Sequence, residues 1–387
     1  MKILYHHRIR SKDGQFVHIE ELTEALRGLG HEIVMVGPAA VERDAFGADA
    51  GLVGVLKRLL HGAIYECMEL AYGLFAYRRL KAAYLRHCPD CIYERYNLFL
   101  PAGVWLKRRY RLPMLLEVNA PLVEERSRFG GLTLARLARW SERFAWRGAD
   151  FVLPVSGMLA ERVRDAGVPD ERIVVIRNGI DPERFDAVAA SDETRRRLGL
   201  DGRLILGFTG FVRSWHGLNQ VIDVIAEDAG RRDLHLLVVG DGPARAELES
   251  YARERGVGSR LTVTGIVQRG AVADYVSAFD VGLQPDVVPY ASPLKLIEYM
   301  ALGRAIVAPA RANIRELLTD GENAVLFDPK APGSLQRAVE RICADASLRR
   351  RLGDAARLEI EKQGLTWRCN AQRVEDLFLR LGVGSAG

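Results

Sequence analysis

The sequence has no long hydrophobic run. No stretch among its 387 residues approaches the roughly 18–20 apolar residues that a membrane-spanning helix requires. Met1 to Arg10 carry charges and histidines where a secretory signal peptide has an apolar core. We therefore expect a cytoplasmic protein, either free or in peripheral contact with the inner face of a membrane.

Cysteine is also scarce. The five cysteines are an odd number and are widely scattered, which is typical of proteins from a reducing compartment. Cys88 and Cys91 form a C-x-x-C, but no second pair completes a zinc site. Two incidental thiols are the favoured interpretation of that pair, and a redox or metal role is the alternative. Nothing else has the spacing of catalytic metal ligands, so we expect no metal ion and no bound cofactor.

The sequence lacks a strong overall charge. Its net charge of +5 is small for its length and does not by itself indicate nucleic-acid binding, so we expect no nucleic-acid partner. Residues 51–147, however, hold 17 Lys and Arg against 8 Asp and Glu, a local excess of +9. Peripheral contact with a membrane is one interpretation of this segment. Solvated helix faces, with basic side chains lying over the core, are the other.

What the sequence does contain is a regular alternation of apolar runs and helical stretches. A chain of 387 residues is too long for one ordinary core and suits two domains. The apolar runs lie at 3–5, 32–36, 91–93, 114–118, 151–155 and 173–176, and again at 204–208, 234–239, 261–264, 281–283, 305–308 and 324–327. Strands that alternate with helices predict parallel sheets. The predicted fold class is α/β, with two Rossmann-like parallel-sheet domains that face each other across a cleft.

A charged stretch without strand character, Asp192 to Leu200, separates the two halves. We place the first domain at residues 1–185 and the second at 186–365. In open parallel sheets, ligands bind beyond the carboxyl ends of the strands. The loops that follow the predicted strands are therefore the places to look for chemistry.

The most informative segment runs from Tyr290 to Gly303. Ser292 is a good N-cap and a proline suits the first helical position, so a helix is predicted to begin here. Lys295 then falls in the first turn, and Glu298, three residues later, lies on the same face. A helix N-terminus beside a lysine is an anion site that suits a diphosphate, and Glu298 could accept hydrogen bonds from the paired hydroxyls of a ribose. A solvent-exposed Lys–Glu pair is the equally weighted alternative.

Two further loops follow predicted strands. The loop from Gly207 to Gly217 includes glycines, which allow close approach to a ligand, and Arg213, which can bind phosphate oxygens. The loop Val239-Gly-Asp-Gly-Pro243 contains Asp241, which we expect to cap the following helix rather than to act in catalysis.

Taken together, these segments resemble the family 4 retaining glycosyltransferases, a glycogen-synthase-like group with the GT-B fold. The resemblance covers nearly the whole chain and is strongest in Asn178-Gly-Ile-Asp, Val239-Gly-Asp-Gly-Pro, Asp280-Val and Ser292 to Ala308. It implies that the first domain binds the acceptor and the second a nucleotide diphosphate sugar. It also implies that a C-terminal helix, within residues 366–387, packs back on the first domain.

The resemblance also implies roles for individual residues. Glu298 matches the second glutamate of the family's E-x7-E motif, which holds the donor ribose, and Arg213 and Lys295 match cations that neutralise the leaving diphosphate. Ile266 and Val267 lie where backbone groups meet the base. The remaining positions assigned to the donor are Gly14, Gln15, Gly210, His216, Tyr290, Ser292 and Leu294, of which Gly14 and Gln15 are expected in the loop after the first strand.

Three residues depart from the family's pattern. Tyr290 stands where the first glutamate of E-x7-E contacts the transferred sugar, and His216, which can be neutral at pH 7, replaces the usual lysine of the phosphate loop. Asn119 stands where many members have a histidine near the anomeric carbon. It can form hydrogen bonds but cannot act as a base. Glu117 and His18 are assigned to the acceptor side of the same site.

The predicted function is therefore transfer of a sugar, with retention, to an acceptor hydroxyl of a glycan or a lipid-linked molecule, in cell-envelope or exopolysaccharide synthesis. A catalytically silent nucleotide-sugar-binding scaffold is the main alternative, motivated by the three departures. A sugar-nucleotide epimerase on the same fold is less favoured. The absence of Asp-x-Asp argues against the metal-dependent single-domain transferase fold. The absence of G-x-G-x-x-G after the first strand argues against a dinucleotide oxidoreductase.

Overall fold

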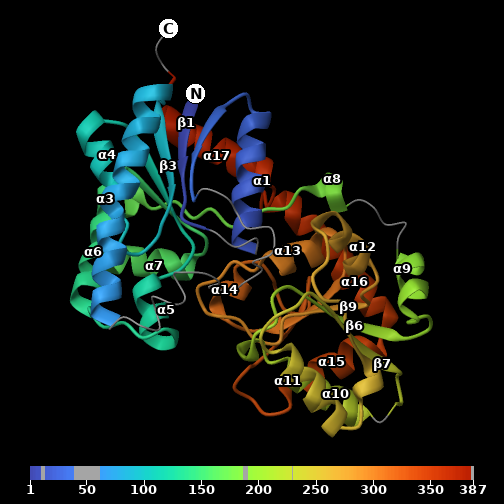
Figure 1. The fold of residues 1–387 in the computed structure, drawn as a ribbon. Helices are drawn as coiled ribbons and strands as arrows, with labels where there is room; N and C mark the ends of the chain where they lie inside the picture. The colour runs from blue at the N-terminus through green and yellow to red at the C-terminus, as the bar shows by residue number, and fades with distance from the viewer. Residues whose placement is uncertain (10–13, 39–61, 186–190, 229, 385–387) are drawn as a thin grey trace. The chain divides into compact units, whose positions relative to one another are not determined.

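The computed structural model describes residues 1–9, 14–38, 62–185, 191–228 and 230–384 (Figure 1). The chain divides into two compact units: unit 1 comprises Met1–Arg177 and Trp367–Gly387, and unit 2 comprises Asn178–Thr366. The first division therefore falls eight residues before the predicted boundary at 185, and the chain returns to unit 1 one residue after the predicted 366. Residues 51–61 of the basic segment lie outside the described residues.

Unit 1 is built on a sheet of five strands in the order β2-β1-β3-β4-β5, with every neighbouring pair parallel. The strands are β1 Lys2–His6, β2 Glu32–Val36, β3 Cys91–Arg95, β4 Met114–Val118 and β5 Phe151–Pro154. Every residue of the central strands β3 and β4 is buried, because helices cover both faces of a parallel sheet. The charged residues Glu94, Arg95 and Glu117 near the carboxyl ends of these strands are therefore exceptions that need partners.

The helices of unit 1 connect these strands. They are α1 Gly14–Gly28, α3 Gly62–His87, α4 Ala102–Tyr110, α5 Leu122–Phe129, α6 Ala135–Gly148, α7 Gly157–Asp165, the short η1 Asp170–Arg172 and the C-terminal α17 Trp367–Arg380. α3 packs against α4, and α5 against α6. α17 lies along α1, where the edge of the His18 ring faces Trp367 at 4.9 Å between centroids. The last helix of the chain is thus part of the first unit's core.

The predicted strand at 173–176 is wrong. The segment runs beside β5 and forms only an isolated bridge, between Val152 and Ile173. Val174 and Ile176 donate backbone hydrogen bonds to β5, each at 3.0 Å. A parallel ladder would need the residue at position 154 to donate one in return, but Pro154 has no backbone N–H. The ladder therefore does not extend.

Unit 2 is built on a sheet of six parallel strands in the order β11-β10-β9-β6-β7-β8. The strands are β6 Leu204–Thr209, β7 Leu234–Val239, β8 Leu261–Val263, β9 Val281–Leu283, β10 Ala305–Pro309 and β11 Val325–Phe327. The helices are α8 Pro182–Phe185, α9 Ser191–Leu198, α10 Leu218–Asp228, α11 Arg245–Glu254, α12 Val272–Ser277, α13 Leu294–Ala301, α14 Ala312–Arg315, α15 Ser334–Ala344 and α16 Ala346–Lys362. Three-residue helical turns lie at Ser214–His216 (η3), Gly258–Arg260 (η4) and Arg269–Ala271 (η5).

Two glycines let aromatic rings pack closely on the sheet of unit 2. A Cβ at Gly207 of β6 would lie 2.1 Å from the Phe279 ring, and one at Gly282 of β9 would lie 2.5 Å from the Tyr299 ring. Both rings are fully buried, and Tyr299 belongs to α13. Gly282 therefore lets the Tyr299 ring of α13 pack directly against β9, and the placement of α13 builds the site described below. No helix in the described ranges is both long and apolar enough to cross a membrane.

Candidate functional site

The start of α13 lies close to the predicted position, but it is capped differently. The helix begins at Leu294, with Pro293 as its cap and no capping side chain. Ser292 is therefore not the N-cap. Its Oγ accepts a hydrogen bond from the backbone N–H of Asn178 at 3.2 Å, and its carbonyl accepts one from Asn178 Nδ2 at 2.6 Å. Pro293 has an extended backbone before the helix. Ser292 therefore anchors Asn178, the first residue of unit 2, through these two hydrogen bonds.

Lys295 lies in the first turn of α13 and faces the loop after β6. Its Nζ is 3.6 Å from the centroid of the Phe208 ring, and Gly210 lies directly beside it. Loss of hydration lowers the pKa of Lys295 to about 7, although nearby Glu298 acts to raise it. The side chain keeps partial exposure. A half-buried cation beside the free N–H groups of a helix start forms a site for an anion.

Glu298 lies one turn further along α13 and faces the end of β6. Its Oε2 accepts a hydrogen bond from Thr209 Oγ1 at 3.3 Å, and burial raises its pKa despite nearby Lys295. The hydroxyl of Tyr299 accepts a bond from the Thr209 N–H at 2.9 Å and holds the same strand end. Lys295 and Glu298 both contact the β6 end and form no ion pair with each other. The predicted alternative of a solvent-exposed Lys–Glu pair is therefore wrong.

The loop after β6 carries a second cation and a neutral histidine. Nδ1 of His216 accepts a hydrogen bond from the Arg213 N–H at 3.2 Å, which leaves the imidazole proton on Nε2. Burial, with Lys295 and Arg213 nearby, lowers the pKa of His216 to about 2, so it is neutral at pH 7, as the sequence suggested. Arg213 is exposed, with its guanidinium 4.9 Å from the Phe211 ring centroid. The positive charge of this loop therefore rests on Arg213.

The loops after β6 and β7 pack against each other backbone to backbone. Gly240 adopts a φ of +142°, and a Cβ there would lie 2.2 Å from the Gly210 carbonyl oxygen. Val212 N donates to Asp241 O at 2.9 Å, which ties the loops together. The side chain of Asp241 accepts from the Gly242 N–H at 2.8 Å and does not cap α11, whose N-cap is Ala244. Its predicted capping role is wrong, but its structural role stands.

The other residues assigned to the donor lie around this edge of the sheet. Ile266, after β8, is 58% exposed, whereas Val267 packs partly into the core. The Tyr290 side chain is only 5% exposed and offers little surface to a ligand. Leu294 is half-buried at the first position of α13. Contact of these residues with a donor stays a prediction.

A second group of predicted residues lies at the carboxyl end of the unit 1 sheet. Glu117 of β4 is 2% exposed, and its carboxylate accepts hydrogen bonds from Arg95, from Asn119 and, at 2.8 Å, from the Tyr93 hydroxyl. Burial acts to raise the pKa of Glu117, but nearby His18 and Arg95 and the two other donors hold it below its usual value. A buried carboxylate needs such partners, and Arg95 and Tyr93 were not among the predicted site residues.

His18 completes this cluster. It is 5% exposed, and its Nδ1 accepts a hydrogen bond from Arg95 Nη1 at 3.2 Å. Burial lowers its pKa to about 4, although Glu117 acts to raise it, so the ring is neutral. His18 and Glu117 thus lie below the surface, and Asn119 is the member with partial exposure. Because its Nδ2 donates to Glu117, the Asn119 Oδ1 is left as a hydrogen-bond acceptor.

Two predictions for the N-terminal segment need correction. Gly14 and Gln15 are the first residues of α1 and do not lie in a loop. A glycine is tolerated there because the first N–H groups of a helix have no partner within it. The preceding residues 10–13 lie outside the described ranges.

Among the described residues, no three His, Cys, Asp or Glu side chains are grouped to hold a metal ion.

Cys88 and Cys91 are free thiols at the start of β3. Cys91 is buried, and burial raises its pKa far above the ordinary range of a thiol. The thiolate is the form that attacks disulfides and binds metals. The geometry therefore favours incidental thiols over the redox or metal role.

Sequence reasoning missed Thr209, Tyr299, Tyr93 and Arg95. Thr209, Tyr93 and Arg95 contact predicted residues over 22 to 89 positions of the sequence, and Tyr299 contacts Thr209 over 90 positions. The one available signal was a charged pair, Glu94 and Arg95, inside an apolar strand. Such residues at the carboxyl end of a parallel strand mark a site.

Comparison with known proteins identifies the family. A model described as glycosyl transferases group 1 matches residues 190–359, and one described as Glycosyltransferase Family 4 matches residues 12–184. The 2-deoxystreptamine glucosyltransferase of Streptomyces kanamyceticus is 30% identical over 304 residues, which cover 76% of this chain and 75% of that protein. The chain belongs to the group 1 glycosyltransferases.

Other members of the family and solved structures agree. The alpha-D-kanosaminyltransferase of Streptomyces kanamyceticus is 31% identical over 59% of this chain, and the match spans 61% of its own length. LpsE of Rhizobium meliloti, a lipopolysaccharide core biosynthesis glycosyltransferase, is 27% identical over 74% of this chain and 80% of its own. Anabaena Alr3699/HepE in complex with UDP-glucose superposes with a TM-score of 0.75 at 18% identity, covering 98% of this chain and 100% of that one. The predicted α/β fold of the GT-B type, with two Rossmann-like domains, is confirmed.

Proposed function

We propose that this glycosyltransferase moves a sugar from a nucleotide diphosphate sugar to an acceptor hydroxyl with retention of configuration. The observation that carries the proposal is the arrangement at the start of α13. Lys295 and Glu298 sit one turn apart and both face the glycine-containing end of β6. A cation and a carboxylate at this spacing suit the diphosphate and the ribose hydroxyls of such a donor, which supports the proposal.

Departure of the diphosphate is the step that these residues would assist. Negative charge builds up on the leaving phosphate as the bond to the sugar breaks, and fixed positive groups stabilise that charge. These positive groups would be Lys295, Arg213 and the N–H groups at the start of α13. Because Lys295 lies in a partly desolvated position, its charge is screened less than that of a surface lysine.

The acceptor hydroxyl must also lose a proton. Asn119 cannot accept one, and His18 and Glu117 are buried and bonded to Arg95. We propose that the departing phosphate takes the proton. Asn119 Oδ1 would then orient a substrate hydroxyl without acting as a base.

We further propose a glycan or lipid-linked acceptor in cell-envelope or exopolysaccharide synthesis, as the name of the Rhizobium relative suggests. The name of the 2-deoxystreptamine glucosyltransferase of Streptomyces kanamyceticus also makes 2-deoxystreptamine an acceptor worth testing. Contact with a membrane through the basic segment 51–147 would suit a lipid-linked acceptor. Sedimentation of the full chain with anionic liposomes would support that contact, and failure to bind at low salt would refute it.

The silent scaffold remains the second candidate because the Tyr290 side chain is buried where the family places a glutamate near the sugar. It predicts nucleotide-sugar binding without turnover. Donor hydrolysis or transfer above background would exclude it.

The decisive experiment is a thermal-shift panel of UDP, GDP, ADP and their common sugar conjugates. A ligand at 100 times its Kd stabilises the fold by about 2.7 kcal/mol, which is readily measured. We expect one nucleotide to raise Tm, and expect Lys295→Ala and Glu298→Ala to abolish the shift. Lys330→Ala, at an exposed position of the same unit, is the control and should keep it. No shift with any nucleotide would refute the donor site.

A further inference from the structure

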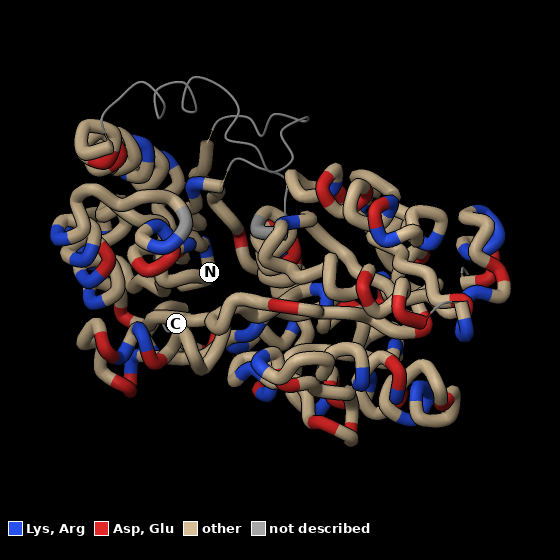
Figure 2. Tube along the Cα trace, turned by 90° about the horizontal axis from the view of Figure 1, so that it is seen from below, with Lys and Arg blue, Asp and Glu red and all other residues tan. Residues whose placement is uncertain are grey.

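Helix α6 carries a row of arginines on its outer face. Arg136, Arg139, Arg143 and Arg147 follow one another at spacings of three, four and four, which places them along one side of the helix, and all are exposed. Lys and Arg positions recur along the helices at the left of Figure 2, on the side where Figure 1 shows α4 and α6. The row belongs to unit 1 and includes none of the residues of the proposed donor site, of which Lys295, Glu298 and Arg213 lie in unit 2.

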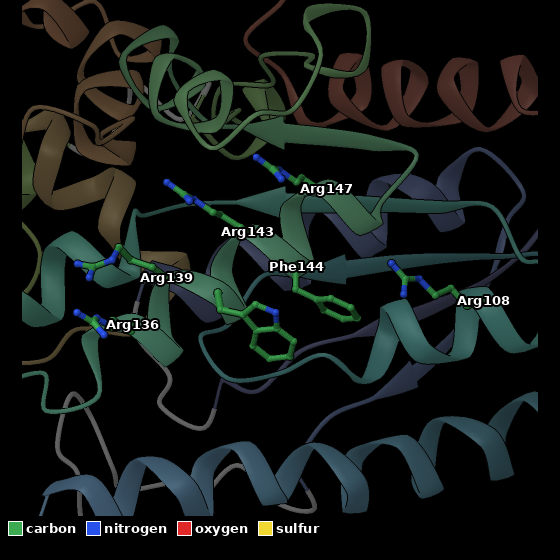
Figure 3. Close-up of a pocket in the computed structure, with 7 residues that line it drawn as sticks. Arg108, Arg136, Arg139, Arg143, Phe144 and Arg147 are labelled. Atoms are coloured by element: carbon green, nitrogen blue, oxygen red, sulfur yellow. The ribbon is translucent and has the colours of Figure 1, made fainter.

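These arginines line a pocket together with a residue of α4. Its volume is about 490 Å³, and Arg108 completes its cationic lining. Trp140 and Phe144 form its apolar part, with ring centroids 5.4 Å apart in a stacked arrangement, and the Arg108 guanidinium lies 4.9 Å from the Phe144 ring centroid. Figure 3 shows the four α6 arginines following the helix, with Arg108 on the other side of Phe144.

The charged residues that line the pocket are all arginines. No carboxylate lines it, and none of its five arginines forms an ion pair within the described part of the chain. Glu142, the one acidic residue of α6, accepts hydrogen bonds from the Tyr96 hydroxyl at 3.0 Å and the Val123 N–H at 3.3 Å. Glu142 lies near enough to Arg143 to interact electrostatically, but no carboxylate lines the hollow that the five arginines share.

This arrangement is unfavourable unless an anion occupies it. Arg139 and Arg143, and Arg143 and Arg147, are like charges four residues apart, and each such pair destabilises a helix by about 0.2–0.5 kcal/mol. Arg147 is held in place, because its Nε donates to the Ala166 carbonyl at 2.7 Å. A bound polyanion would remove the repulsion and find part of its site already ordered.

We propose that this pocket binds the phosphate groups of a di- or polyphosphorylated ligand. The guanidinium fork binds phosphate with two parallel hydrogen bonds, and several forks side by side match adjacent phosphates. A polyuronate carries at most one charge on each ring, so it would place too few charges in a pocket of about 490 Å³ to balance five arginines. Trp140 is 51% exposed, and its exposed ring face would pack against the apolar or ring-bearing part of the ligand.

The phosphates could belong to a soluble ester or to lipid headgroups, so the site is tested first with a soluble probe and then with vesicles. Inorganic tripolyphosphate is titrated into the full-length protein carrying Lys295→Ala, so that the donor site does not contribute. Calorimetry reports binding. We expect saturable binding that weakens at least tenfold in Arg139→Gln/Arg143→Gln.

The matched control is Arg27→Gln/Arg253→Gln, which removes the same charge from exposed positions on other helices. It should bind tripolyphosphate as the parent does. Absence of saturable binding, equal loss in the control, or binding of polygalacturonate in place of tripolyphosphate would each overturn the proposal. Because Lys295→Ala is present throughout, failure here is distinct from failure of the donor site.

Vesicles identify the source of the phosphates. Sedimentation with phosphatidylglycerol vesicles but not phosphatidylcholine vesicles, lost in Arg139→Gln/Arg143→Gln and displaced by tripolyphosphate, would support the site with a lipid headgroup as ligand. Binding of tripolyphosphate without vesicle binding would support it with a soluble ligand. Vesicle binding that both double variants retain, without binding of tripolyphosphate, would overturn it.

Discussion

At the residue scale, the site depends on how burial tunes a few charges. Lys295 is an ordinary lysine in the sequence, but its place between α13 and Phe208 lowers its pKa to about 7. His216 and His18 are neutral for the same reason, and neither titrates near pH 7. Near neutral pH, we therefore expect the protonation of Lys295 to respond to a ligand in the proposed donor site.

This gives a prediction about nucleotide affinity. A bound diphosphate favours the charged ammonium and raises the pKa of Lys295, so binding above pH 7 takes up a proton. Affinity should fall as the pH rises from 7 to 9, approaching about tenfold per pH unit. Calorimetry with the nucleotide found in the thermal-shift panel, in two buffers of different ionisation enthalpy, measures the uptake.

Lys295→Arg is the control for this prediction. Arginine stays protonated over the whole range, so the variant should bind with little dependence on pH. A flat affinity for the parent protein between pH 7 and 9 would contradict the assignment of Lys295 to the diphosphate.

At the element scale, the site depends on loops that approach each other more closely than side chains allow. Gly240 lies against the carbonyl of Gly210, and backbone hydrogen bonds connect the loops after β6 and β7. The sequence predicted that glycines here would let a ligand approach. In the structure, part of their role is to let the two loops approach each other.

Gly240→Ala tests this contact. A Cβ at this position would meet the Gly210 carbonyl at 2.2 Å, so the backbone must shift. We expect a loss of about 1–3 kcal/mol of unfolding free energy beyond the penalty of a positive φ. Urea denaturation followed by circular dichroism measures it.

The comparison is Gly256→Ala. Gly256 also has a positive φ, of +72°, but a Cβ at this position would have no atom within 4 Å. The variant should lose only the conformational part, about 1–2 kcal/mol. Equal losses for the two variants would show that the loop contact contributes nothing.

At the scale of the whole molecule, the C-terminal helix belongs to unit 1 although unit 2 precedes it in the sequence. Asn370 Nδ2 donates to the Arg177 carbonyl at 2.8 Å, at the point where the chain leaves unit 1. Phe378 is fully buried, whereas its neighbour Leu379 is 49% exposed. The first unit is therefore complete only when the last residues have been made.

Phe378→Ala should destabilise unit 1 by about 3–5 kcal/mol, because it leaves a cavity in the core. Calorimetry should show a lowered unit 1 transition, while the transition that the nucleotide raises keeps its temperature. Leu379→Ala should change neither transition by more than about 0.5 kcal/mol. A drop in the nucleotide-sensitive transition with Phe378→Ala would show that α17 stabilises unit 2 instead.

The sequence by itself determined the fold class, eleven of the twelve predicted strands and the segment that carries Lys295 and Glu298. These follow from local patterns, namely apolar runs of strand length, glycines after strands and a helix start. The one incorrect strand prediction, at 173–176, failed because Pro154 on neighbouring β5 has no backbone N–H to donate to that segment. That fact concerns a partner strand and is invisible within the segment itself.

Only the tertiary structure decided which polar groups meet. The packing of helices and strands brings together three pairs of residues: Thr209 with Glu298, Arg95 with Glu117, and Asn178 with Ser292. The same holds for the pKa of Lys295 and for the pocket between α4 and α6, since burial and proximity depend on every neighbouring element. Patterns of period two and 3.6 specify elements, whereas the chemistry of a site depends on distances between them.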